Sequence, residues 1–388
     1  MEKITYTIPI CLTHRCNLNC IYCFQSHDNQ HEMTYDACKS CIDWVFDNVL
    51  NDNNNRAEIT FFGGEPLLRF ELIKAVYDYT IDKHQSDNYR FFASTNGTVL
   101  TEEMKEWFHN HKDKFILGLS LDGGRESQNA NRSHSFDLID LDFFYSNWPK
   151  QNVKMTISEK SIHRYAEDVK FIHSLGFGIN GADLCVGTFN WASDEYIRVL
   201  APQLQNLIDY YLDHPDHYNA LFKKDLASCA AKKVRKKNCG CGDRVHYFDS
   251  DGVHYPCTFI TPMTFSKTEI QEIKKTDFCN IDNFVDEDCF NSCYIYEICR
   301  TCHAEDFLAT KSFKHYDKTK CRMKKMEAIV LAEYNARLIQ KNPSVYDESK
   351  LFYTIEAIKR IKGLYFEDFK QYFITKEKPE NPEKSKGN

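Results

Sequence analysis

The chain has 388 residues, enough for a large barrel and a smaller domain at roughly 100–200 residues per domain. A mean hydropathy of -0.54 and the lack of any run of about 18 apolar residues exclude a transmembrane helix, and the N-terminal residues lack the layout of a signal peptide. A formal net charge of -7 and 17 cysteines indicate a cytoplasmic protein without a nucleic-acid or membrane partner, in which cysteines bind metals or clusters and do not form disulfides.

Strand-like and helix-like segments alternate along the first half of the chain. Apolar, β-branched runs predict strands at Thr5–Leu12, Ile59–Phe62, Tyr89–Thr95, Phe115–Leu121, Val153–Ile157 and Gly178–Leu184. Helical periodicity predicts helices at Thr34–Val49, Leu68–His84, from Thr101 onward, Leu138–Trp148, and Ile162–Leu175, the last ended by Gly176 in a left-handed conformation. Strands alternating with helices imply a parallel sheet with right-handed crossovers, either a doubly wound sheet or an incomplete barrel.

The composition changes after a further helix predicted from Ser193 to about Leu212. Cysteines, glycines and short turns prevail up to Cys321, and helices are predicted at Met323–Gln340 and from Lys350 to about Tyr365. We therefore expect a barrel domain at 1–215, a cysteine-rich domain at 216–322, a helical extension at 323–374 and a disordered tail at 375–388.

Three cysteines in the run CNLNCIYC, Cys16, Cys20 and Cys23, follow the first predicted strand directly. A cubane iron-sulfur cluster takes four thiolates, so three can hold three irons and leave the fourth open to a substrate, as a catalytic metal site requires. The same three cysteines could instead form half of a zinc site.

The spacing C-x3-C-x2-C followed by Phe24 resembles the signature of radical S-adenosylmethionine (SAM) enzymes. The resemblance implies that SAM chelates the open iron and that its reductive cleavage yields a 5'-deoxyadenosyl radical. It also implies that Phe24 lies near the adenine.

Polar motifs follow the next predicted strands at their C-terminal ends, where barrel enzymes place their active sites, which favours a partial (β/α)6 TIM barrel in the α/β class. Each motif alone is ordinary turn chemistry, but their order also resembles the radical SAM pattern. By that resemblance the SAM contacts are Gly63, Gly64, Glu65 and Pro66 of GGEP, Thr95 and Asn96 of TNG, Ser120 and Asp122 of SLDG, and Arg132. Paired glycines would let a ligand approach the backbone, and Glu65 would face an ammonium. Gln128 stands where the family has a histidine.

A second set of cysteines, with the layout C-x10-G-x4-C and then C-x3-C-x5-C-x2-C before a distant last cysteine, resembles the SPASM extension of radical SAM enzymes. The resemblance implies two auxiliary four-iron clusters, and so three [4Fe-4S] clusters in all. The first would be held by Cys239, Cys241, Cys257 and Cys302, and the second by Cys289, Cys293, Cys299 and Cys321. The alternative is a pair of zinc sites. Cys229 and Cys279 could replace a ligand, whereas Cys11, Cys38, Cys41 and Cys185 are predicted to be core thiols.

Radical SAM enzymes with a SPASM domain modify peptides and proteins, so the resemblance implies a peptide maturase that forms a thioether or carbon-carbon crosslink or epimerises a residue. An anaerobic sulfatase-maturating enzyme is the alternative, although Phe62 and Ser94 stand where that branch carries glutamine, and its catalytic base corresponds to Asp225 only in a shifted register. A zinc-stabilised interaction protein and a small-molecule radical SAM enzyme also stay open. The expected partners are a peptide or protein substrate, an electron donor such as flavodoxin or ferredoxin, and a separate leader-binding protein.

Overall fold

The computed structural model describes residues 4–25, 30–149, 151–185, 190–237 and 239–373. The strands are β1 (Ile4–Thr13), β2 (Asn55–Gly63), β3 (Tyr89–Thr95), β4 (Phe115–Leu119), β5 (Asn152–Ile157), β6 (Gly178–Leu184), β7 (Tyr247–Phe248) and β8 (His254–Tyr255). Within these residues, no helix has both the length and the apolar character needed to cross a membrane.

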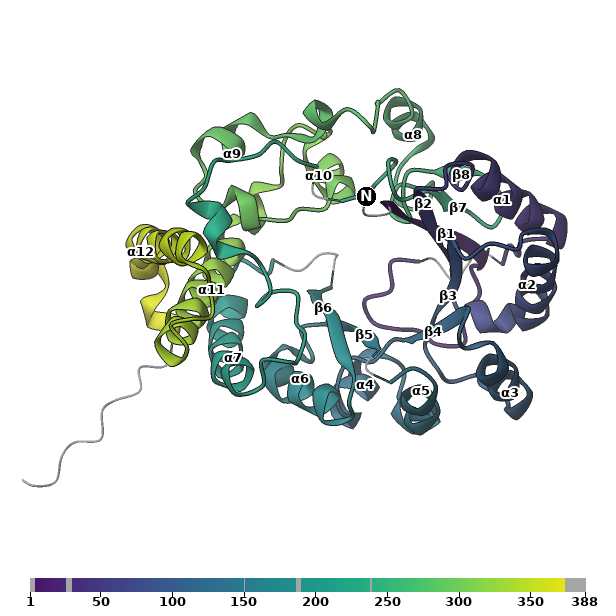
Figure 1. The fold of residues 1–388 in the computed structure, drawn as a ribbon, viewed down its shortest axis with the longest axis horizontal. Helices are drawn as coiled ribbons and strands as arrows, with labels where there is room; N and C mark the ends of the chain where they lie inside the picture. The colour runs from purple at the N-terminus through teal and green to yellow at the C-terminus, as the bar shows by residue number, and fades with distance from the viewer. Residues whose placement is uncertain (1–3, 26–29, 150, 186–189, 238, 374–388) are drawn as a thin grey trace, which may run out of the picture.

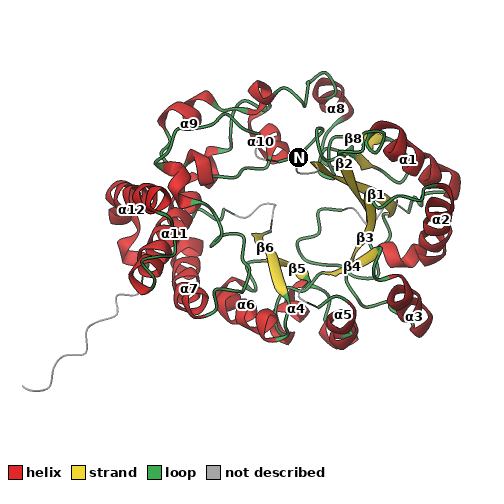
Figure 2. Cartoon of the chain, viewed as in Figure 1, coloured by secondary structure: helices red, strands yellow, loops and turns green. Residues whose placement is uncertain are grey.

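The helices follow the strands in regular alternation through the first half of the chain. They are α1 (Tyr35–Asn48), α2 (Phe70–Lys83), α3 (Glu102–His111), α4 (Arg125–Asn131), α5 (Leu141–Asn147), α6 (Tyr165–Ser174), α7 (Asp194–Asp213), α8 (Lys267–Ile273), α9 (Glu287–Ser292), α10 (His303–Thr310), α11 (Cys321–Lys341) and α12 (Glu348–Phe369). Figures 1 and 2 show β1 to β6 on the inner side of an open ring, with α1 to α6 outside them.

The described strands form two sheets, so the barrel is open. β4, β3, β2 and β1 are parallel neighbours, β7 joins β1 in parallel, β8 pairs with β7, and β5 pairs in parallel with β6. One hydrogen bond, from the Leu121 N–H to the Lys154 carbonyl at 3.0 Å, links the end of β4 to β5. The predicted partial TIM barrel is confirmed.

The outer faces of the strands pack against the helices and form the main core. Ile8, Ile10 and Leu12 of β1 are fully buried with Ile42 and Val45 of α1. The predicted strands all form, and Gly176 ends the α6 region with φ of 86°, as the sequence predicted. Cys38 and Cys41 lie buried in α1, as predicted for core thiols.

Three features of the fold were not predicted. A short helix, α4, follows β4, and the predicted helix over Leu138–Trp148 is reduced to α5 because Phe136–Leu138 forms a 3-10 turn. The cysteine-rich part also supplies β7, which extends the barrel sheet through the pairing of Phe248 with Ile10. The cysteine-rich part and the barrel therefore share one sheet.

The last two helices cover the open side of the ring, where α11 packs against α7 and α12 (Figure 1). α12 also packs against the 3-10 turn Leu226–Cys229. The tail predicted at 375–388 lies outside the described residues.

Candidate active site

A cavity of about 600 Å³ lies between the C-terminal ends of the barrel strands and the cysteine-rich part. Among the residues predicted from motifs, its walls contain Cys16, Cys20, Cys23, Phe24, Gly63, Gly64, Glu65, Thr95, Asn96, Ser120 and Arg132. The cysteine-rich part contributes Cys302, and α11 contributes Met323, Lys324 and Glu327. The strand-end motifs and the first cysteine loop thus face one common space.

The cysteine loop is held in place by the segment that follows β4. The Ile21 N–H donates to the Asn131 carbonyl at 3.0 Å, and the Asn19 N–H donates to Ser133 Oγ at 2.9 Å. Burial raises the pKa of Cys16, and it raises the pKa of Cys20 to about 11. Metal binding must therefore displace a proton from these thiols.

In the described part of the chain, one set of three candidate ligand atoms lies within 4.8 Å of one another, that of Cys11, His14 and Asp249, and no three cysteines meet this limit.

The glycines of GGEP make room for the protein's own backbone. The Gly64 N–H donates to the Thr13 carbonyl at 2.8 Å, and the Glu65 N–H donates to the Arg15 carbonyl at 2.9 Å. A Cβ on Gly63 would lie 2.2 Å from the Thr13 carbonyl oxygen, and one on Gly64 would lie 2.2 Å from that of Arg15. These glycines thus let the turn dock against the start of the cysteine loop. Both also line the cavity, and their contact with a ligand stays a prediction.

Glu65 lies in the cavity wall, but its carboxylate accepts hydrogen bonds from neighbouring residues of the protein. Oε1 accepts hydrogen bonds from the Leu67 N–H and the Thr95 hydroxyl, and Oε2 accepts one from the Asn96 N–H at 2.8 Å. Burial raises the pKa of Glu65 to about 7. Glu65 thus fixes the end of β3, and its contact with an ammonium remains a prediction.

Asp122 is fully buried behind the cavity and is not one of the residues that line it. Its carboxylate accepts hydrogen bonds from Tyr22 at 2.5 Å, Asn131 at 3.0 Å and the Thr156 N–H at 2.9 Å, and it pairs with Arg132 at 3.1 Å. Gln128 accepts from the Asp122 N–H, so it has a structural role of its own. The geometry makes Asp122 a support for Arg132 instead of a direct SAM contact. Pro66 likewise starts a 3-10 turn outside the cavity wall.

Asp225 is displaced from the cavity altogether. Its carboxylate pairs with Lys350 of α12 at 3.3 Å, its side chain is 56% exposed, and the cavity wall does not include it. A general base has to lie within hydrogen-bonding reach of the proton that it takes. The role of Asp225 as catalytic base therefore stays a prediction, and its observed position does not support it.

The cavity also holds charged residues that the motifs did not reveal. Lys320 pairs with Glu305 at 2.7 Å, and Glu327 pairs with Lys324 at 3.1 Å and with Lys224 at 3.3 Å. Lys154 of β5 and Asp183 of β6 also line the wall. Both lie in predicted strands, but the sequence did not show which face of each strand would point inward.

Electrostatic interactions and hydrogen bonds link cysteines within each of the two predicted groups. In the first, the thiol of Cys241 interacts with those of Cys239 and Cys257, and Cys302 interacts electrostatically with Cys257. In the second, Cys289, Cys299 and Cys321 each interact electrostatically with Cys293. These interactions agree with the interleaved division, which stays a prediction. Cys229 is buried and also lies near Cys293, so the second group has a fifth neighbouring thiol.

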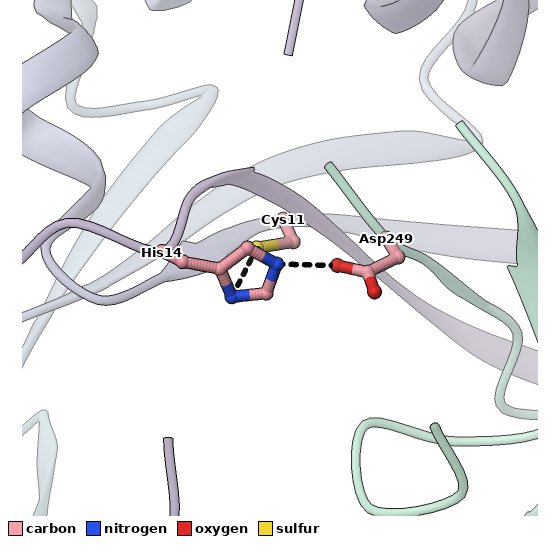
Figure 3. Close-up of side chains that lie close together, drawn as sticks. All are labelled: Cys11, His14 and Asp249. Carbon is pink, nitrogen blue, oxygen red and sulfur yellow. Dashed lines mark hydrogen bonds and ion pairs between the residues drawn. The ribbon is translucent and has the colours of Figure 1, made fainter. Parts of the chain in front are cut away.

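A third polar cluster joins β1 to the segment after β7 (Figure 3). His14 Nε2 lies 2.8 Å from Asp249 Oδ1, and Cys11 Sγ lies 3.9 Å and 4.0 Å from the two ring nitrogens of His14. The hydrogen bond to Asp249, followed by that to Cys11, raises the pKa of His14 to about 10. Because His14 contacts both Asp249 and Cys11 directly, this buried cluster links β1 to the segment that follows β7.

Comparison with known proteins agrees with this geometry. Residues 10–140 match the sequence profile of the radical SAM superfamily. The chain is 37% identical over 112 residues to the uncharacterized protein MJ0907 of Methanocaldococcus jannaschii, covering 29% of this chain and only 37% of that protein. It is 23% identical over 320 residues to the cysteine-type anaerobic sulfatase-maturating enzyme of Clostridium perfringens, covering 74% and 85%. It is 26% identical over 277 residues to the antilisterial bacteriocin subtilosin biosynthesis protein AlbA of Bacillus subtilis, covering 66% and 55%.

A solved structure shares the fold. Native anSMEcpe with bound AdoMet and Cp18Cys peptide superposes with a TM-score of 0.66 at 19% sequence identity. The superposition covers 88% of this chain and 100% of that chain. The likeness confirms the α/β architecture with its open parallel barrel.

Proposed function

The chain carries a radical SAM domain homologous to those of two maturation proteins, and we propose that it is an enzyme that modifies a peptide or protein substrate. One observation carries the proposal. The thiols of Cys16, Cys20 and Cys23, the SAM-type motifs at the strand ends and Cys302 of the cysteine-rich part all line one cavity. The cofactor, the substrate and an auxiliary redox group would then meet in one space.

The described residues fit the cofactors that this proposal needs. Cys16, Cys20 and Cys23 would hold a [4Fe-4S] cluster, and the two further groups of thiols would hold auxiliary [4Fe-4S] clusters. When bound, the first cluster would supply the electron that cleaves SAM to a 5'-deoxyadenosyl radical, which removes a hydrogen atom from the substrate. The three-cluster count rests on the grouping of the thiols.

The protein's own part is to position the cofactor and exclude water. Phe24, Asn96, Ser120 and Arg132 face the cavity, where they would contact the adenine, ribose and methionyl groups of SAM. Arg132 is held rigidly by Asp122, so its guanidinium is oriented before a ligand arrives.

For the reaction itself, we place a crosslinking or epimerising peptide maturase first. Phe62 and Ser94 both line the cavity, so the loss of the two glutamines changes the site that binds SAM and substrate. Asp225 lies outside the cavity. Formation of formylglycine from cysteine or serine is the second candidate, because the sulfatase-maturating enzyme of Clostridium perfringens is similar over most of its length.

We also propose a cytoplasmic location, where the thiols stay reduced, and a low-potential electron donor such as flavodoxin or ferredoxin. A separate leader-binding protein is a further candidate partner. The division into a barrel at 1–215, a cluster domain at 216–322 and a helical extension at 323–374 remains our proposal for the domains.

The test is the triple variant Cys16→Ala, Cys20→Ala and Cys23→Ala, reconstituted anaerobically with iron and sulfide. We expect loss of 5'-deoxyadenosine formation under dithionite and loss of about four of twelve irons. The matched control, Cys38→Ala with Cys41→Ala, removes thiols buried in α1 and should keep both signals. Continued SAM cleavage by the triple variant would refute the assignment, and purified protein with zinc and no visible absorption would favour the interaction protein.

A further inference from the structure

Lys318 joins two segments that carry proposed ligands of the second auxiliary cluster. It begins the 3-10 turn Lys318–Lys320, directly before Cys321 at the start of α11. Its ammonium reaches back to the start of α9, where Lys318 Nζ donates to Cys289 Sγ at 2.7 Å and to Asp286 Oδ2 at 2.8 Å. Lys318 is therefore a charged side chain in direct contact with a thiol that the proposed function assigns to a cluster.

Asp286 holds this ammonium in place. Asp286 is buried, with 1% of its surface exposed. Its Oδ1 accepts a hydrogen bond from the Cys289 N–H at 2.9 Å, and its Oδ2 accepts one from the Tyr316 N–H at 2.8 Å in addition to that from Lys318. The side chain of Lys318 is 51% exposed, but its head group is directed at the sulfur by this buried partner.

The charge of Lys318 acts on two thiols of the second group. Burial raises the pKa of Cys289 to about 11 and also raises the pKa of Cys321, and at each thiol Lys318 opposes that rise. Lys318 thus favours additional negative charge on sulfur at both positions.

The second group of thiols stands back from the cavity. Cys302 of the first group lines the cavity wall, whereas Cys289, Cys293, Cys299 and Cys321 do not. An electron that leaves a substrate in the cavity would therefore reach the first auxiliary cluster before the second.

Hydrogen bonds to the sulfurs and nearby charges set the reduction potential of an iron-sulfur cluster, because they stabilise the negative charge that reduction adds. On the basis of the proposed function, we propose that Lys318 raises the reduction potential of the second auxiliary cluster. An electron on the auxiliary cluster at Cys302 would then pass to the second, so that the one loses an electron and the other gains it. No bond forms or breaks in this step, and Lys318 keeps its proton.

The test is a redox titration monitored by EPR. It uses the variant Cys16→Ala, Cys20→Ala and Cys23→Ala, reconstituted anaerobically, which should keep only the auxiliary clusters, and adding Cys302→Ala identifies the signal of the first. In Lys318→Met we expect the reduced second cluster to be disfavoured about tenfold, as loss of a charged hydrogen bond predicts. This corresponds to a potential lower by about 59 mV for one electron. The first auxiliary cluster should keep its potential.

Two further variants separate charge from structure. Lys318→Gln retains an N–H donor without the charge, so its potential should fall between those of the wild type and Lys318→Met. The control Lys314→Met removes an exposed lysine of the same segment and should change neither potential.

Iron analysis of the same samples decides the remaining cases. If Lys318→Met loses about four irons, Lys318→Gln alone decides by the same shift. An unchanged potential of the second cluster in the variants that keep their iron, or loss of that cluster from both, would overturn the inference. A wild type that takes up no auxiliary clusters would instead refute the cluster assignment of the proposed function, on which the inference rests.

Discussion

Asp122 illustrates how a motif residue can serve a cofactor site from behind it. The SLDG motif placed Asp122 at a strand end, and the structure confirms that placement. Its carboxylate, however, accepts hydrogen bonds from Tyr22, Asn131 and the Thr156 N–H, and it pairs with Arg132. No lone pair is therefore directed into the cavity. A strand-end motif therefore predicts the position of a residue better than the direction of its side chain.

Asp225 gives a direct test of that distinction at the residue scale. Because its carboxylate pairs with Lys350 away from the cavity, we expect Asp225→Asn to keep SAM cleavage and substrate turnover within about twofold of the wild type. The loss in unfolding free energy should be at most about 1 kcal/mol, as for a surface ion pair. Assays of 5'-deoxyadenosine and product by mass spectrometry check this, and a 100-fold loss of product would restore Asp225 as the base.

At the scale of elements, the sequence predicted the parts whose signals are local. The six barrel strands and most helices follow from apolar periodicity, and Thr34 caps α1 through a hydrogen bond from Ala37. β7 could not be predicted because a two-residue strand has no periodicity and because its parallel pairing with β1 joins distant segments of the chain. Lys154 and Asp183, which line the cavity, were missed for a related reason: which strand residues face inward depends on how the open barrel is assembled.

The GGEP turn allows a prediction about the docking of β2 against the cysteine loop. In Gly64→Ala the new Cβ would stand 2.2 Å from the Arg15 carbonyl oxygen, with no flexible side chain to move aside. We expect a loss of about 1–3 kcal/mol in unfolding free energy and loss of the first cluster, measured by urea unfolding and iron content.

The same substitution at Gly363 serves as the matched control. A Cβ there would meet nothing within 4 Å, and Gly363 lies inside α12, so Gly363→Ala should stabilise the protein by about 0.5–1 kcal/mol. Equal effects of the two substitutions would contradict the docking argument.

The pair His14–Asp249 ties β1 to the segment after β7, and its titration should be visible in stability. The folded pKa of His14 is about 10, against 6.5 for the free side chain, so its stabilisation is fully present below about pH 6.5 and is lost as the pH rises through about 10. The total corresponds to at most about 5 kcal/mol. We expect the urea midpoint of the wild type to fall between pH 7 and 9.5, and that of Asp249→Asn to be lower at pH 7 and to fall less. If the urea midpoints of the wild type and of Asp249→Asn changed with pH in parallel, the pair would make no pH-dependent contribution to stability.

Across the whole molecule, the arrangement brings together cysteines that lie far apart in the chain. The first loop is part of the barrel, whereas Cys302 reaches the same cavity from the cysteine-rich part, which is attached to the barrel through β7 and the pair His14–Asp249. Spacing alone could not establish this proximity, because the pairing of distant segments depends on the folded sheet. The geometry suits electron exchange between a substrate in the cavity and the cluster proposed at Cys302.

The interleaved ligand sets make a prediction that only pairs of variants can test. Cys239 and Cys302 belong to one proposed cluster and Cys321 to the other, so Cys302→Ala should remove about four of twelve irons. Adding Cys239→Ala should remove no more, whereas adding Cys321→Ala should raise the loss to about eight. Cys229→Ala is the control, because Cys229 lies beside Cys293 without belonging to the proposed ligands, and it should keep all the iron. Iron analysis with Mössbauer spectroscopy distinguishes these cases. If the pair Cys239 and Cys302 lost eight irons while the pair Cys302 and Cys321 lost four, the division of ligands would have to be redrawn.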